Sequence, residues 1–208
     1  VKELLENSID AGAKRIEIEI EDGGETLIRV SDDGVGIHPD DIEKAFLPHA
    51  TSKISTLEDL FKIMTMGFRG EALPSIAAIA KVKLSSKQAD SIAGKEIVIE
   101  GGNIISISDA AINKGTFMDV RDLFYNVPAR KKFLKSTARE TALIGDIINR
   151  MAMAYPDIAF TFINNGKQQF SSYGNGNVLD TIRKIYGRSI ETNLIRFESH
   201  GDILSAYG

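Results

Sequence analysis

The segment VKELLENSIDAGAKRIEIEIEDGGETLIRVS (residues 1–31) contains the pattern of one helix and two strands in close succession. Its first turns predict a short helix that ends near Gly12, which can take the left-handed conformation used at helix ends. Residues 15–21 alternate isoleucine with charged residues, and a period of two is typical of a strand with one buried face. Asp22-Gly23-Gly24 predicts a tight turn, so residues 26–31 should return as the antiparallel partner strand.

The rest of the chain continues this mixture of helices and hairpin-connected strands. Further strands are expected at residues 81–86, 96–100, 104–108, 116–121, 159–163 and 168–173, and helices at 39–46, 57–64, 71–79, 129–154 and 178–186. This order argues for an α+β fold with helices on one face of a largely antiparallel sheet, and against alternating βαβ units. Glycines and asparagines at 174–177 predict a linker. Residues 1–177 would then form the first domain, and residues 178–208 a linker helix and the start of a second α/β domain.

The composition is that of an ordinary globular protein and excludes several kinds of site. Of the 208 residues, 43% are hydrophobic and 26% are charged, and no apolar run is long enough to span a bilayer. Cysteine is absent, which excludes disulfides, thiol nucleophiles and thiolate zinc sites and suits a reducing cytosol. His38, His49 and His200 lack the spacing of metal ligands. Because the net charge is −4, any contact with nucleic acid must come from a local basic patch.

Glu3 and Asn7 are separated by about one helical turn and should therefore share one face of the first helix. A carboxylate can accept a proton from an attacking water, and a carboxamide oxygen is a hard ligand suited to Mg²⁺. A solvated helix face that carries the same two residues is the alternative. The pair alone does not separate these interpretations.

Asp32-Asp33-Gly34-Val35-Gly36 ends the second predicted strand in a loop. A carboxylate held there, Asp32, can accept a hydrogen bond from an exocyclic amine such as that of adenine. Gly34 and Gly36 would let the backbone approach a planar base closely. A surface turn and a fragment of a calcium loop are alternatives, although the further acidic residues of an EF-hand are missing. Gly115-Thr116, at the start of a later strand, offers a hydroxyl near the base.

A second glycine loop, Gly67-Phe68-Arg69-Gly70, leads into the helix predicted at residues 71–79. Backbone N–H groups of such a loop and of a helix start can bind an anion, and a plain loop-to-helix junction is the alternative. His49-Ala50-Thr51-Ser52-Lys53 lies in the preceding loop, where two hydroxyls and a lysine suit either a lid over phosphates or a helix cap. Neither glycine loop matches the P-loop or the G-x-G-x-x-G pattern.

Arg130-Lys131-Lys132, together with Lys135 and Arg139, forms a basic cluster on the long helix predicted at residues 129–154. Such a cluster can contact DNA phosphates, and a solvated helix face is the alternative. Both interpretations place these side chains on the surface of the protein.

Five segments of the chain together resemble the MutL-type DNA mismatch-repair ATPases. These belong to the GHKL superfamily, with gyrase, heat-shock chaperones and histidine kinases. The segments are Val1–Ala13, Asp32–Gly36, His49–Lys53, Gly67–Leu73 and Asp122–Leu134. The first two are shared across the superfamily, whereas the last two are much narrower and point to MutL-type proteins. The resemblance covers nearly the whole chain. It implies the GHKL (Bergerat) ATPase fold, a two-layer sandwich with helices on one face of a mixed, mostly antiparallel sheet.

The resemblance implies Mg²⁺-dependent hydrolysis of ATP, with a role for each matching residue. Glu3 would be the general base that activates water, Asn7 would bind Mg²⁺ beside the phosphates, and Asp32 would bind the adenine amine. The other ATP-binding residues implied are Gly36 and Thr116 at the base, Thr51, Ser52 and Lys53 in the lid, and Gly67, Phe68, Arg69, Gly70, Glu71, Ala72 and Leu73 around the triphosphate. Each of these positions carries the residue type that the family pattern expects.

The resemblance also implies that the chain is an N-terminal fragment of a longer protein. In the family, a segment before Val1 and a second domain complete the ATP-bound dimer and supply a lysine and much of the DNA-binding surface. We therefore expect weak ATP hydrolysis, weak dimerisation and weak DNA binding from the fragment. The full-length protein would form a homodimer on binding ATP and relay mismatch recognition to downstream repair proteins. It would act in the cytoplasm of a bacterium, or in the nucleus of a eukaryote.

A module that binds a nucleotide or a protein partner without turnover is the alternative function. Replacement of Glu3 separates the two, because only an ATPase should lose turnover while it keeps ATP binding. A histidine kinase is disfavoured, since the Gly67–Gly70 run is foreign to that class and no phosphoacceptor helix is recognisable.

Overall fold

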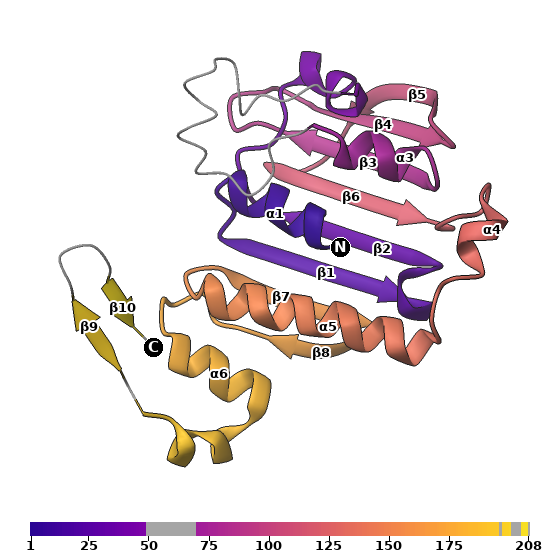
Figure 1. Cartoon of the computed structure of the whole chain (residues 1–208). Coiled ribbons are helices and arrows are strands. Elements are labelled where there is room, and N and C mark those ends of the chain that lie inside the picture. Colours follow the sequence, from indigo (N-terminus) through magenta and orange to yellow (C-terminus); the bar gives the residue numbers. More distant parts are fainter. Residues whose placement is uncertain (49–69, 196, 201–204, 208) are drawn as a thin grey trace.

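The computed structural model describes residues 1–48, 70–195, 197–200 and 205–207. Its strands are β1 (Arg15–Glu21), β2 (Leu27–Asp32), β3 (Lys81–Lys87), β4 (Gly94–Glu100), β5 (Asn103–Ala110), β6 (Gly115–Arg121), β7 (Ala159–Asn164), β8 (Lys167–Ser171), β9 (Glu198–His200) and β10 (Ser205–Tyr207). Its helices are α1 (Lys2–Asp10), α3 (Ala72–Ala77), α4 (Pro128–Lys131), α5 (Thr137–Ala154) and α6 (Val178–Tyr186). Short 3₁₀ turns are η1 (Asp22–Gly24), η2 (Pro39–Asp41), η3 (Lys44–Phe46) and η4 (Arg188–Asn193). Helices α1, α3 and α5 lie in front of the main sheet in Figure 1.

The main sheet is mixed but mostly antiparallel, as predicted. Among the described residues it has eight strands in the order β5-β4-β3-β6-β2-β1-β7-β8. β1 and β2 form the predicted antiparallel hairpin, in which Ile18 lies opposite Val30. β1 and β7 pair in parallel, with Ile18 opposite Phe162, and α5 provides the crossover that this pairing requires. The remaining neighbours pair antiparallel.

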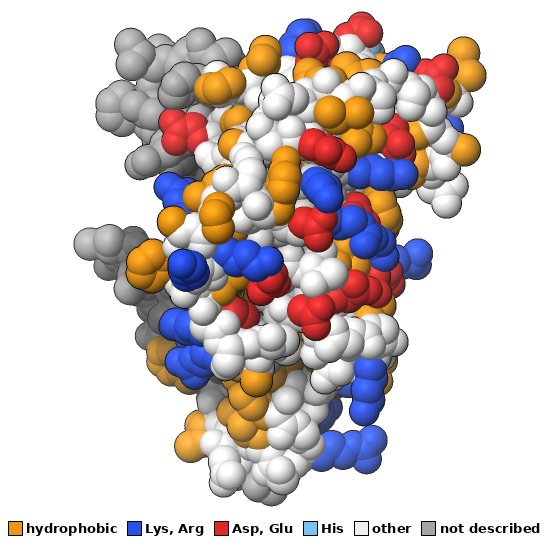
Figure 2. Space-filling view, turned by 90° about the vertical axis from the view of Figure 1, so that its right-hand side faces the viewer, with side chains coloured by type: hydrophobic (Ala, Val, Ile, Leu, Met, Phe, Trp, Pro, Cys, Tyr) orange, Lys and Arg blue, Asp and Glu red, His pale blue; other side chains and the backbone are white. Residues whose placement is uncertain are grey.

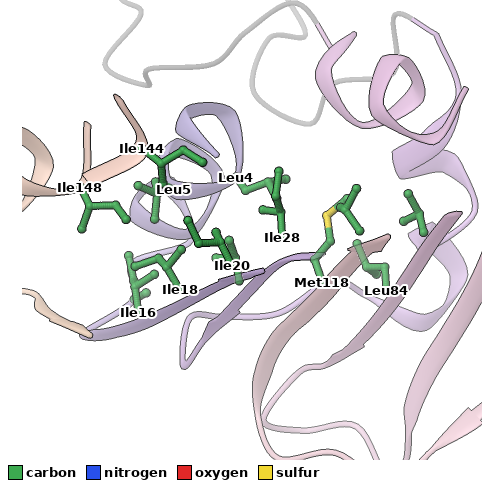
Figure 3. Packing of buried hydrophobic residues seen from close by; sticks show 14 of the residues in the cluster. Leu4, Leu5, Ile16, Ile18, Ile20, Ile28, Leu84, Met118, Ile144 and Ile148 are labelled. Atoms are coloured by element: carbon green, nitrogen blue, oxygen red, sulfur yellow. The ribbon is translucent and has the colours of Figure 1, made fainter. Parts of the chain in front are cut away.

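The hydrophobic core lies between the sheet and the helix layer. Ile16, Ile18 and Ile20 of β1 are at most 1% exposed, which confirms that the alternating pattern points isoleucine inward. Figure 3 shows Leu4 and Leu5 of α1 on the helix side of this strand. Burial of one such side chain stabilises the fold by about 1.5–3 kcal/mol. The register of β1, and with it the position of α1, is therefore strongly specified.

The prediction of one long helix at residues 129–154 is wrong, because the chain forms two helices, α4 and α5, with a break between them. At Ser136 the backbone is extended, with φ −61° and ψ 148°, and its carbonyl accepts hydrogen bonds from the N–H groups of Arg139 and Glu140. The Lys135 N–H in turn donates to the Glu140 carboxylate at 2.9 Å. These bonds satisfy backbone donors at the start of α5, so helix initiation at Thr137 competes with continuation from α4.

Smaller differences concern the segments after β2. The helix predicted at residues 39–46 is replaced by the two 3₁₀ turns η2 and η3. The helix predicted at residues 57–64 lies outside the described residues. Gly12 has φ +70°, which confirms the left-handed end predicted for the first helix.

The predicted boundary between two domains lies just before α6. Asn177 caps this helix, because its side-chain oxygen accepts a hydrogen bond from the Leu179 N–H at 3.0 Å. Helix α6 packs beside α5 and β8, and η4, β9 and β10 follow it. The division at residues 177 and 178 stays a prediction. No helix in the described part of the chain is long and apolar enough to cross a membrane.

Candidate functional site

Asp32, at the end of β2, is the centre of the polar cluster expected to bind a base. Its carboxylate accepts hydrogen bonds from the Ser8 hydroxyl of α1 at 2.8 Å and from the Gly34 N–H at 2.9 Å. Thr116 lies opposite Asp32 in β6, and its backbone N–H donates to the same carboxylate. Burial raises the pKa of Asp32 above its ordinary value, while these three donors act in the opposite direction.

A second set of hydrogen bonds links Thr116 to Ser86 of β3. The two hydroxyl oxygens are 3.0 Å apart. The Ser86 hydroxyl donates to the Gly115 carbonyl at 2.9 Å and accepts from the Ile37 N–H at 2.8 Å. Ser86 thus joins β6 to the loop that follows β2. Ser8 and Ser86 were not among the predicted site residues, because their roles depend on contacts between distant parts of the chain.

Gly34 and Gly36, in the loop after β2, allow the loop backbone to lie very close to neighbouring segments of the protein. A Cβ at Gly36, which has φ +76°, would lie 2.2 Å from the Lys87 carbonyl oxygen. A Cβ at Gly34 would lie 2.9 Å from the Ala11 carbonyl oxygen, and the Val35 N–H donates to that oxygen. The sequence-based interpretation assigned these glycines to approach of a base. The structure shows that they let the loop lie against α1 and β3.

Asp33, the neighbour of Asp32, has a different role in the same loop. Its carboxylate accepts hydrogen bonds from the backbone N–H groups of Lys14 and Arg15, at 2.7 and 2.9 Å. Asp33 therefore fastens the loop to the start of β1, and this leaves Asp32 as the carboxylate of the pair that lies in the polar cluster with Thr116.

Helix α1 carries the predicted catalytic pair. Glu3 is exposed and Asn7 is half-buried, while Leu4 and Leu5 bury the opposite side of the helix in the core. Asn7 directly precedes Ser8, so the hydrogen bond from Ser8 to Asp32 fixes α1 next to the polar cluster. The described residues contain no group of three or more acidic or histidine side chains that could hold a metal. The Asn7 amide oxygen on α1 nevertheless fits Mg²⁺, because this ion needs few protein ligands when phosphates and water complete its coordination.

The lid residues and most of the second glycine loop lie outside the described part of the chain: Thr51, Ser52, Lys53, Gly67, Phe68 and Arg69. Gly70 has φ +62° and Glu71 directly precedes α3. Ala72 and Leu73 form the first turn of α3, and Leu73 packs against the core. Gly70 and Glu71 thus lead directly into a helix that is anchored to the core, while the glycine loop before Gly70 stays a prediction.

The basic cluster is spread over α4, the segment after it and the first turn of α5, which carries Arg139, and does not lie on one long helix. Arg130, Lys132, Lys135 and Arg139 are exposed, and Lys131 pairs with Glu25 at 2.7 Å. Figure 2 shows Lys and Arg intermingled with Asp and Glu over the face that it presents. Both interpretations of this cluster, a DNA contact and a solvated surface, are compatible with its exposure.

Comparisons with known proteins show the family to which this chain is similar. Residues 1–109 match the family model described as "Histidine kinase-, DNA gyrase B-, and HSP90-like ATPase". The whole chain aligns with the DNA mismatch repair protein MutL of Clostridium perfringens at 60% identity and with that of Clostridium tetani at 61%. The chain spans 31% and 34% of the length of these two relatives.

Solved structures give the same result for the fold. The Aquifex aeolicus MutL ATPase domain complexed with ADP is 32% identical, with a TM-score of 0.75, and the match covers 95% of this chain and 68% of that one. The N-terminal domain of a DNA repair protein is 33% identical, with a TM-score of 0.79, and the match covers 95% of this chain and 59% of that one.

Proposed function

This chain belongs to the MutL family of DNA mismatch-repair proteins, and we propose that it binds and hydrolyses ATP as part of a switch in mismatch repair. The observation that carries this proposal is the position of Asp32, whose carboxylate is fixed by donors from α1, β6 and its own loop. Asp32 is half-buried, and a carboxylate with a free acceptor position is suited to the exocyclic amine of adenine. The ADP-bound relative from Aquifex aeolicus supports a nucleotide in this fold.

For hydrolysis we assign Glu3 as the general base and Asn7 as the ligand of Mg²⁺. Glu3 lies on the exposed side of α1, where its carboxylate can reach a water molecule and accept a proton from it. The amide oxygen of Asn7, one turn later, can bind the cation. Mg²⁺, when bound, neutralises charge on the phosphates. Transfer of a phosphoryl group to water depends mainly on such neutralisation and on alignment of the nucleophile.

The remaining proposed ATP contacts follow from membership of the family. Gly36 and Thr116 would line the base pocket beside Asp32. Residues 51–53 would belong to a lid, and residues 67–73 would surround the triphosphate with backbone N–H groups. Pro74, the third residue of α3, has no N–H, so Ala72 and Leu73 supply the free donors of its first turn.

In the full-length protein, we propose that ATP binding drives homodimerisation and that hydrolysis resets the dimer. The dimer would bind DNA and relay mismatch recognition to downstream repair proteins. The exposed basic segment at residues 130–135 can add contacts to DNA phosphates. Since the relatives reported above are bacterial, the proposed site of action is the bacterial cytoplasm.

The test is titration of the full-length protein with a non-hydrolysable ATP analogue, with and without Mg²⁺, followed by turnover measurements with ATP. Glu3→Ala should lower turnover by about 10²–10⁴-fold, because it removes the general base, and should leave analogue binding unchanged. Asn7→Ala should weaken binding of the analogue only when Mg²⁺ is present.

Unchanged turnover in Glu3→Ala would overturn the assignment of the base. Binding of the analogue without any turnover in the wild-type protein would favour the alternative, a nucleotide-binding module. Lys167→Ala, at an exposed lysine of β8, serves as the matched control, and it should change neither measurement.

A further inference from the structure

The Asp32 carboxylate has almost all of its hydrogen-bonding capacity occupied by the protein itself. An ionised carboxylate offers about four acceptor positions. Three are filled, by the Ser8 hydroxyl, the Gly34 N–H and the Thr116 N–H. One acceptor position is left for a ligand, which matches a single N–H of an exocyclic amine.

The proton positions at Ser86 can be assigned from its partners. A serine hydroxyl has one hydrogen and two lone pairs. The hydrogen is used on the Gly115 carbonyl, and one lone pair accepts the Ile37 N–H. Either hydroxyl could donate across the 3.0 Å contact between Ser86 and Thr116. Because the Gly115 carbonyl can only accept, we assign the Ser86 hydrogen to it and the Thr116 hydrogen to Ser86. The Thr116 oxygen consequently presents only lone pairs to a ligand.

We propose that Ser8 and Ser86 are positioning residues that make the base pocket an acceptor-only surface and so select adenine over guanine. This inference rests on the proposed function. Adenine carries an amine at position 6, which donates to an acceptor. Guanine carries a carbonyl there, so two acceptors would face each other without a proton between them.

Neither serine can act by touching the base. Ser8 is 3% exposed and Ser86 is 1% exposed, and each is covered by the elements that it joins. Ser8 orients Asp32 from α1, whereas Ser86 orients Thr116 from β3. The two serines belong to different elements and act on different acceptors. Their effects on selectivity can therefore be measured independently.

The test compares three non-hydrolysable triphosphates on the full-length protein by calorimetry: the adenosine analogue, the guanosine analogue and a purine analogue without the 6-amine. The wild-type protein should prefer the adenosine analogue to both others. Ser8→Ala should lower the ratio of adenosine to guanosine affinity by about tenfold, because a hydrogen bond to a charged group is lost. Ser86→Ala should lower the same ratio, through Thr116.

Two further variants separate positioning from a merely structural role. Ser8→Cys keeps nearly the same volume with a weak donor and should behave as Ser8→Ala does, whereas Ser86→Thr keeps the hydroxyl and should restore selectivity. Ser106→Ala, at an exposed serine of β5, is the control and should change nothing.

A parallel loss of affinity for all three analogues in the serine variants would overturn the inference, since a structural role acts on every nucleotide alike. Unchanged selectivity in Ser8→Ala, Ser8→Cys and Ser86→Ala would also overturn it. Failure of the wild-type protein to bind any of the analogues would instead count against the proposed function.

Discussion

The two ends of the proposed nucleotide site are built in different ways. The base end (Ser8, Asp32, Gly34, Ser86 and Thr116) is held by hydrogen bonds between α1, β2, β3 and β6. The phosphate end (Glu3, Asn7 and the start of α3) includes an exposed carboxylate on a helix whose other side is buried. The difference indicates that the proposed base site is preformed by the fold, whereas the proposed hydrolysis would depend on side chains at its surface.

The largest loss of stability is expected from a substitution that forces the backbone of the base end apart. A Cβ at Gly115, where φ is +124°, would lie 1.9 Å from the Asp32 carbonyl oxygen. Gly115→Ala should lower the free energy of unfolding by about 3 kcal/mol, because β2 and β6 must separate. Urea denaturation of the purified chain measures this loss.

Gly166→Ala is the matched control, since this glycine has φ +71° with nothing within 4 Å of its Cβ. That change should cost only about 1–2 kcal/mol, the strain of the left-handed backbone. Equal losses in the two variants would show that the close contact between β2 and β6 does not stabilise the base end.

An intermediate effect is expected from acidification, which acts on Asp32. Burial raises the pKa of Asp32, so the folded protein binds a proton there at a pH where the unfolded chain stays ionised. As the pH falls through this raised pKa, protonation stabilises the unliganded fold but removes the acceptor for adenine. ATP affinity should then fall by about tenfold per pH unit, without unfolding caused by this group.

Asp32→Asn controls for protonation of the nucleotide itself, and its weak ATP binding should lack the contribution of Asp32 to the pH dependence. Titrations of both proteins over the same buffers give the comparison. Identical pH profiles would mean that Asp32 does not contact the base.

The smallest change in the free energy of unfolding is expected from a substitution at the phosphate end. Because Glu3 is exposed, Glu3→Ala should change the free energy of unfolding by no more than about 1 kcal/mol, the size of a helix-dipole contribution. Leu5→Ala, two residues away at a fully buried position, should cost about 2–5 kcal/mol in the same denaturation experiment. A cost well above about 1 kcal/mol for Glu3→Ala would show that the phosphate end is also part of the folded framework.

The sequence predicts the hairpins and the first helix because each has a local period or turn. Alternating isoleucines identify β1, and Asn165-Gly166 identifies the β7–β8 hairpin. The parallel pairing of β1 with β7 has no local pattern, since it joins segments far apart in the chain. The break near Ser136 was missed because residues on both sides of it favour a helix, and the decision depends on capping bonds from Glu140.

The candidate site also divides into features with a local sequence pattern and contacts between distant segments. Asp32 was predicted because a carboxylate between a strand end and glycines is visible in the sequence. Ser8 and Ser86 were missed, because their partners lie 24 and 30 residues away along the chain. A serine one turn before a helix end is common, and only the folded structure shows which carboxylate it contacts.

The parallel pairing of β1 with β7 has a consequence for synthesis on the ribosome. β1 and β2 leave the exit tunnel and can form their hairpin early, but the other side of β1 has no partner until residues 159–164 have been translated. During that interval a strand rich in isoleucine keeps an open edge, which is the geometry that invites pairing with another nascent chain. Translation of the second half of the chain therefore has to be fast enough, or a chaperone close enough, to protect that edge until β7 arrives.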